Sequence, residues 1–108
     1  MNPVYALYAG AASVSLLLDP DGHRPAILTE IAVWPEHQGK GWGSEILRMV
    51  TTEADQDGVA IMLSVEPGPN GLTFKQLVSW YRRYGFESLS SDGTTDPETM
   101  CRLPQVST

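Results

Sequence analysis

The run Gln38-Gly39-Lys40-Gly41-Trp42-Gly43 is the segment of this chain with the clearest capacity for chemistry. Its glycines stand at alternate positions, just before an amphipathic stretch that extends from Ser44 to Asp57. Glycine leaves the backbone N–H groups uncovered by side chains, and the macrodipole is positive at a helix N-terminus. The run therefore predicts a binding site for phosphate or diphosphate, with an ordinary tight turn as the alternative.

For the glycine run to bind an anion in this way, a strand must precede it and a helix must begin directly after it. Pro25 introduces the apolar segment Ala26–Val33, which stops before Pro35 and is predicted to be the strand. The amphipathic stretch supplies the helix, and Gly58 ends it. The next apolar run, residues 59–65, is typical of a strand covered on both faces. Together these segments predict a parallel β-α-β crossover with the anion site at the carboxyl end of its first strand.

The remaining segments complete a small mixed sheet. Strands over 4–9, 12–18 and 26–33 should form an antiparallel meander, because tight turns cannot connect parallel neighbours. Thr73 is a predicted N-cap for a second helix through Tyr84, which Gly85 closes. Segments 86–89 and 99–103 are predicted to be a final hairpin. The fold class is therefore α/β (α+β), in the order β-β-β-α-β-α-β-β. One domain should span 1–108, with 104–108 as a frayed tail.

The amino-acid composition limits the classes of partner and the cellular location that can be expected. A net charge of −6 and a pI near 4.6 argue against nucleic acid and favour cationic partners such as amines. The lone cysteine, Cys101, suits a reducing cytoplasm, and with only His23 and His37 as companions it predicts no metal site. No basic residue precedes Arg24, so a signal peptide is not expected. Glycine and serine break the apolar start too often for a membrane span.

Two motifs resemble those of the GNAT superfamily of N-acetyltransferases. The segment from Glu30 to Gly43 is similar to the acyl-CoA motif (Arg/Gln)-x-x-Gly-x-(Gly/Ala), which is matched by Gln38, Gly41 and Gly43. The segment Trp80-Tyr81-Arg82-Arg83-Tyr84-Gly85-Phe86 resembles the family's aromatic-Tyr-x-x-x-Gly-Phe signature. The resemblance covers residues 26–89. It implies a GNAT-like fold and acetyl-CoA (coenzyme A) as the cofactor.

The start of the chain departs from the family pattern. Typical members carry a strand and one or two helices before the segment that begins here, and these elements help to wall the acceptor site. The acceptor pocket is therefore expected to be either open or completed by a second subunit in a homodimer.

The resemblance also implies which residues hold the cofactor. The pyrophosphate would lie on the N–H groups of the glycine turn, with Lys40 offsetting part of its charge. The pantetheine arm would run beside a splayed strand and pair with Ile31 and Val33. An N–H near Ala32 or Val33 would hold the thioester oxygen. The predicted cofactor-binding residues are Ile31, Ala32, Val33, Gln38, Gly39, Lys40, Gly41, Trp42, Gly43 and Ser44.

The catalytic predictions are Tyr81 and Glu30. Tyr81 occupies the family's general-acid position, and its ordinary pKa of about 10 lies near the value of about 8.5 for a thiol. Its place on the apolar stripe of the second helix leaves a core role as the alternative, and Tyr84 is the fallback. Glu30 stands where some relatives place a catalytic glutamate. An ordinary exposed strand carboxylate is the alternative there, and Glu66 acting through water, or water alone, is the reserve base.

The sequence thus predicts an N-acetyltransferase that moves an acetyl group to a primary amine. The acceptor classes are a protein lysine or N-terminus, a polyamine or another small amine. No cysteine lies near the motifs, so direct transfer in a ternary complex is expected. Neither nucleic acid nor a membrane is a predicted partner. The alternatives are a non-catalytic acyl-CoA-binding module and a small acidic protein that occupies a basic partner surface.

Overall fold

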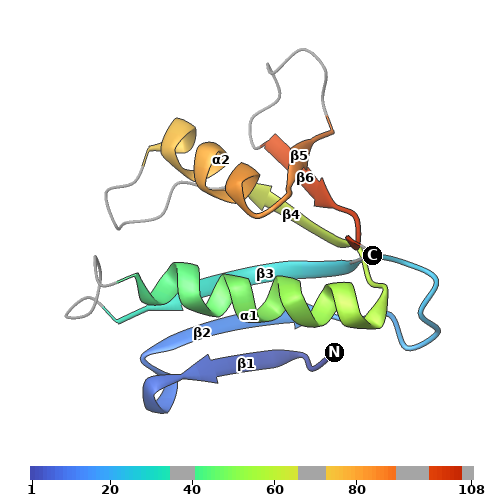
Figure 1. Ribbon diagram of the computed structural model, residues 1–108, viewed down its shortest axis with the longest axis horizontal. Coiled ribbons are helices and arrows are strands. Elements are labelled where there is room, and N and C mark those ends of the chain that lie inside the picture. Colours follow the sequence, from blue (N-terminus) through green and yellow to red (C-terminus); the bar gives the residue numbers. More distant parts are fainter. Residues whose placement is uncertain (35–40, 66–72, 90–97, 106–108) are drawn as a thin grey trace.

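A mixed sheet with helices packed on it forms the chain (Figure 1). The computed structural model describes residues 1–34, 41–65, 73–89 and 98–105. The elements in these ranges, in chain order, are β1 (Val4–Leu7), the 3-10 helix η1 (Tyr8–Gly10), β2 (Ala12–Leu17), β3 (Ala26–Val33), α1 (Trp42–Asp57), β4 (Ile61–Val65), α2 (Phe74–Arg83), β5 (Glu87–Ser88) and β6 (Glu98–Arg102). The predicted order of strands and helices is confirmed.

The strands lie in the order β1-β2-β3-β4-β6-β5. The first three form the predicted antiparallel meander, and β3 and β4 are parallel. The last strand, β6, pairs antiparallel with both β4 and β5 and lies between them. The connection through α2 therefore passes over β6 to reach β5 at the edge of the sheet.

One face of the sheet carries both helices. Alternate residues of the strands are buried there, including Val14, Leu28 and Leu63, and they form one core with Ile46 of α1 and Val78 of α2. The opposite face is covered by no helix among the described residues. It exposes large side chains such as Leu17 and Ile27, which are neighbours in the β2–β3 register. The helices and the open face thus divide the molecule into two sides.

Helix α2 has the predicted N-cap, Thr73, and the predicted closing glycine, Gly85, although its last helical residue is Arg83 rather than Tyr84. The Thr73 hydroxyl accepts a hydrogen bond from the Gln76 N–H, and the Gln76 side chain accepts one from the Thr73 N–H, which makes a capping box. At the other end Gly85 has a φ of 93°, and the Phe86 N–H donates to the Tyr81 carbonyl. This is a Schellman ending, which needs a left-handed residue at the glycine position.

Several element boundaries differ from the prediction by one or more residues, and two of them lie close to the candidate site. The strand expected over 4–9 ends at Leu7, because Tyr8 and Ala9 adopt φ values of 55° and 57° and turn the chain into η1. The helix expected from Ser44 begins at Trp42, inside the glycine run.

None of the described helices is both long enough and apolar enough to cross a bilayer.

Candidate functional site

A gap opens between β3 and β4 at the carboxyl end of the parallel pair. Ala26 pairs with Ile61 and Ile27 with Met62, and the β3–β4 ladder stops there. Strand β3 continues to Val33 on β2 alone, while β4 diverges from it (Figure 1). The pair therefore splays at its carboxyl end, as the resemblance implies.

The β3 edge that faces this gap can be assigned from its pairing with β2. The Trp34 N–H donates to the Ala11 carbonyl at 2.8 Å. Backbone groups alternate between the two edges of a strand, so Ala32 and Glu30 also point their N–H and C=O groups toward β2. Ile31 and Val33 then point theirs toward the gap. These are the two residues predicted to pair with an extended arm.

The N-terminus of α1 stands at the same end of β3. Its N-cap is Gly41 at a φ of 81°, and a glycine has no side chain that could cap the helix. Helix α2, by contrast, is capped by its own Thr73 and Gln76. Among the described residues, no group accepts a hydrogen bond from the N–H of Gly43 or Ser44. The first turn of α1 therefore presents amide donors where the macrodipole is positive.

Trp80 of α2 packs against this first turn. Its indole N–H donates to the Ser44 hydroxyl at 2.8 Å. A Cβ placed on Gly43 would lie 3.7 Å from both the Trp80 ring and a Val33 methyl group. Trp80 therefore joins the glycine turn, the end of β3 and the helix that carries Tyr81. In the sequence, Trp80 stands out only as part of the second motif, and its aromatic character beside Tyr81 is the signal that marks it.

Tyr81 lies in the core. It is 6% exposed, and its ring packs edge-on against Phe86 with centroids 5.6 Å apart. Burial raises the pKa of Tyr81 to about 12. Among the described residues, none accepts a hydrogen bond from its hydroxyl. The prediction of near-neutral proton transfer assumed a pKa near 10, and the buried hydroxyl is a weaker acid than that.

Glu30 lies on the other side of the sheet from Tyr81. The side chains of Ile31 and Val33 pack against the core, so alternation places those of Glu30 and Ala32 on the open face. Glu30 is exposed there beside its register partner Ser15. The two predicted catalytic residues are therefore not in contact. They lie on opposite faces of the sheet.

Several predictions concern residues outside the described ranges. Gln38, Gly39 and Lys40 of the glycine run are among them, as are His37 and Glu66. Gly41, Trp42, Gly43 and Ser44 are the described part of the predicted phosphate site.

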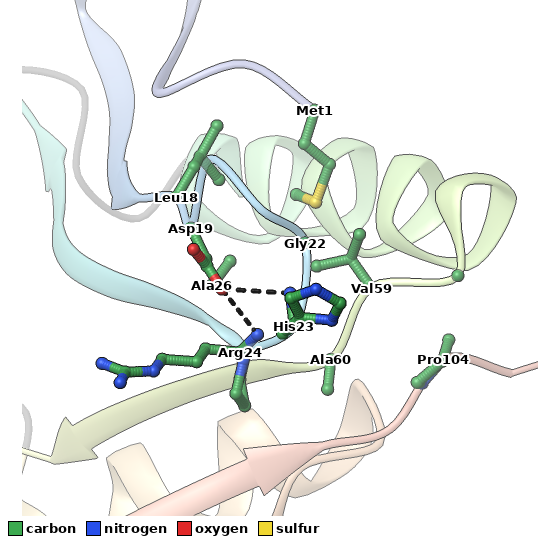
Figure 2. Close-up of a pocket in the computed structure, with 12 residues that line it drawn as sticks. Met1, Leu18, Asp19, Gly22, His23, Arg24, Ala26, Val59, Ala60 and Pro104 are labelled. Carbon is green, nitrogen blue, oxygen red and sulfur yellow. Dashed lines mark hydrogen bonds between the residues drawn. The ribbon is translucent and has the colours of Figure 1, made fainter.

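A pocket of about 390 Å³ lies at the opposite end of the sheet (Figure 2). It is bordered by the β2–β3 turn, the start of β4 and Pro104. The Asp19 carboxylate fixes that turn by accepting hydrogen bonds from the N–H groups of Asp21, His23 and Arg24. None of the predicted site residues lines this pocket, so size alone does not identify the candidate site.

Comparisons with known proteins agree with this geometry. A family model described as an acetyltransferase (GNAT) domain matches residues 4–88. Among solved structures, the anti-CRISPR protein AcrVA5 has a TM-score of 0.67 at 17% identity, covering 93% of this chain and 98% of that chain. The ribosomal-protein-S18-alanine N-acetyltransferase from Escherichia coli has a TM-score of 0.67 at 23% identity. The match covers 91% of this chain and 64% of that chain.

A third structure was solved with a ligand. N-acetylglutamate synthase from Neisseria gonorrhoeae, complexed with coenzyme A and N-acetyl-glutamate, has a TM-score of 0.59 at 16% identity, covering 88% of this chain and 23% of that chain. No curated protein matches the sequence. This chain thus spans nearly all of AcrVA5 but less than two thirds of the E. coli enzyme.

Proposed function

The chain belongs to the GNAT acetyltransferase family, which makes it an acyl-CoA-dependent N-acyltransferase with acetyl-CoA as cofactor, and from this premise we propose that it acetylates a primary amine. Transfer is direct, in a ternary complex. The acceptor is a protein N-terminus, a protein lysine, a polyamine or another small amine. The net charge of −6 favours such cationic acceptors.

One observation carries the proposal. The β3–β4 ladder ends after Ile27 and Met62, next to a helix whose N-cap residue is a glycine. A strand edge beside an open gap suits an extended arm that bears amides. A helix N-terminus suits a diphosphate. Coenzyme A contains both groups in that order, so these residues fit the cofactor.

The binding roles follow from the backbone. Ile31 and Val33 direct N–H and C=O groups into the gap and would pair with the arm. Gly43 and Ser44 would offer amide donors to the diphosphate, and Gly41 and Trp42 adjoin them at the start of α1. When bound, acetyl-CoA supplies an activated thioester carbonyl. Because the Ala32 N–H points toward β2, an N–H on the gap edge beside Ala32 would stabilise the negative charge that develops on the thioester oxygen.

The proton-transfer roles fall to two side chains. Glu30 would accept a proton from the attacking amine on the open face, with Glu66 or water as the reserve base. Tyr81 would donate to the departing sulfur from the helix face. With its pKa at about 12, full transfer to a thiolate of pKa about 8.5 is uphill by roughly 5 kcal/mol in the free chain. The Tyr81 hydroxyl is therefore assigned a hydrogen-bonding role that strengthens as negative charge develops on sulfur.

The test measures binding and turnover separately. Calorimetric titration with coenzyme A should give a saturable isotherm. Thiol release from acetyl-CoA is then followed against a peptide with an N-terminal alanine, a lysine peptide, spermidine and nourseothricin. The alanine peptide and nourseothricin are chosen after the names of two similar solved structures, the ribosomal-protein-S18-alanine N-acetyltransferase from Escherichia coli and a nourseothricin acetyltransferase. Failure to bind coenzyme A at millimolar concentration would refute the proposal.

A second candidate is a module that binds acyl-CoA without turnover. The burial of Tyr81 and its raised pKa favour this candidate, because they weaken the predicted acid. The two candidates differ in the same assay. Binding without thiol release across all four acceptor classes would establish the module, and release with any one of them would establish the enzyme.

A further inference from the structure

The connection between β1 and β2 contains strained backbone at residues that have no role in the proposed function. Tyr8 and Ala9 have φ values of 55° and 57°, in the left-handed region that non-glycine residues seldom occupy. The two residues begin η1, which lies at the same end of the sheet as the α1 N-terminus (Figure 1). Strain of this kind persists only where surrounding contacts hold it. The contacts of Tyr8 show what those are.

Tyr8 holds the first turn of α1 in two ways. Its ring stacks on the Trp42 indole, with centroids 4.0 Å apart and an interplanar angle of 20°. Its hydroxyl donates to the Glu45 carboxylate at 2.6 Å. Trp42 is the first residue of α1, and Glu45 lies in the same first turn. One side chain therefore contacts the turn at both its start and its end.

The bond to Glu45 matters because of charge. A carboxylate in the first turn complements the macrodipole, but it also opposes the binding of a diphosphate at the same N-terminus. The Tyr8 hydroxyl holds this carboxylate toward η1, on the flank of the helix. Tyr8 is 47% exposed, so it does this at the surface rather than as part of the core.

We propose that Tyr8 is a positioning residue for the diphosphate of coenzyme A. It fixes the Trp42 end of the turn by stacking and keeps the Glu45 carboxylate away from the amide donors. The inference rests on the proposed cofactor site, and it concerns affinity for the cofactor rather than the acyl-transfer step.

The experiment titrates coenzyme A into the full chain and into three variants. Tyr8→Phe keeps the stack and frees the carboxylate, so the Kd should rise by about twofold to fivefold, the effect of one charge near a helix N-terminus. Adding Glu45→Gln to Tyr8→Phe should return the Kd to within about twofold of the unsubstituted chain. The KM for acetyl-CoA should follow the Kd while kcat at saturation is unchanged.

Tyr5→Phe is the matched control. Tyr5 lies on β1 and accepts a hydrogen bond from the Asn2 N–H, away from the first turn of α1. It should change the melting temperature and leave the Kd unchanged. A purely structural Tyr8 would behave in the same way, and Glu45→Gln would then give no rescue. An unchanged Kd in Tyr8→Phe, or no rescue by Glu45→Gln, would overturn this inference and leave the proposed function standing. An unsubstituted chain that fails to bind coenzyme A would overturn the proposed function as well.

Discussion

The indole N–H of Trp80 donates a 2.8 Å hydrogen bond to the Ser44 hydroxyl, which joins the two helices across 36 residues of sequence. Ser44 lies in the first turn of α1, and Trp80 is the neighbour of Tyr81 in α2. The ring of Trp80 also packs on that of Tyr81, with centroids 5.0 Å apart. The predicted cofactor turn and the predicted acid are therefore connected through one side chain.

This connection should be measurable as a coupling energy. Trp80→Phe keeps an aromatic ring but removes the donor, and Ser44→Ala removes the acceptor. A double-mutant cycle in urea should give a coupling of about 1 kcal/mol, the net value of one part-buried hydrogen bond. Additive single effects would show that the two groups do not interact in solution.

The two glycines of the helix start should respond to alanine in opposite directions. Gly41 has a φ of 81°, so Gly41→Ala should destabilise the fold by about 1–2 kcal/mol through backbone strain. Gly43 is helical, and a Cβ there would make ordinary contacts at 3.7 Å. Gly43→Ala should stabilise by up to about 1 kcal/mol. Urea denaturation measures both, and equal signs would contradict the assigned backbone conformations.

The same pair explains part of what the sequence could predict. The family motif requires glycine at the first of these positions and accepts alanine at the second, as their backbone conformations and surroundings allow. Local signals of this kind also located β3, between Pro25 and Pro35, and α2, between Thr73 and Gly85. In each case the proline, threonine or glycine at the boundary limits the local backbone conformation or caps the adjoining helix. These effects are local, so they can be predicted without knowledge of tertiary contacts.

Other features depend on contacts that no local pattern encodes. The position at which β3 and β4 separate, after Ile27 and Met62, depends on how the two strands pack in the sheet and not on the residues of either strand alone. The positive φ values of Tyr8 and Ala9 occur in residue types that do not favour turns, and the contacts that hold them lie in α1. Tyr81 could be placed on an apolar stripe, but its pKa depends on how completely the core encloses it.

A partly buried ion pair should dominate the response of the fold to acid. The Arg102 guanidinium binds both Asp55 carboxylate oxygens, at 2.7 and 2.9 Å, and also donates to the Tyr84 carbonyl. Removing the carboxylate with Asp55→Ala would leave a side chain that is 5% exposed without its counter-charge, at a cost of about 3–5 kcal/mol. Urea denaturation at neutral pH measures this loss. Asp57→Ala is the matched control, because Asp57 is 41% exposed and pairs with the terminal amine, so its loss should be smaller.

The pH dependence of this pair has a defined sign. Hydrogen bonds from Arg102 lower the pKa of Asp55. Its contribution to stability is therefore present above the ordinary value near 3.8 and is lost as the pH falls through the lowered pKa. Asp55→Asn should flatten the acid limb of the stability curve below about pH 4. A variant with the same acid limb as the unsubstituted chain would exclude this pair as its source.

Tyr81 should produce the opposite limb, at alkaline pH. Burial raises its pKa to about 12, so the unfolded chain loses this proton first, near pH 10. Stability is fully present below pH 10 and should fall by up to roughly 3 kcal/mol as the pH rises toward 12. Tyr81→Phe should remove that part of the alkaline slope in urea denaturation followed from pH 8 to 11. An unchanged slope would show that the hydroxyl is solvated in the free chain.

The same variant tests the proposed role in transfer. If the Tyr81 hydroxyl stabilises the departing sulfur, Tyr81→Phe should lower kcat by about 100-fold, at the lower end of general acid catalysis because the raised pKa weakens the donor. The Kd for coenzyme A should hold, since the phenyl ring keeps its packing on Phe86. Tyr84→Phe is the matched control from the same helix end and should keep most of the rate. A larger loss in Tyr84→Phe than in Tyr81→Phe would transfer the acid role to Tyr84.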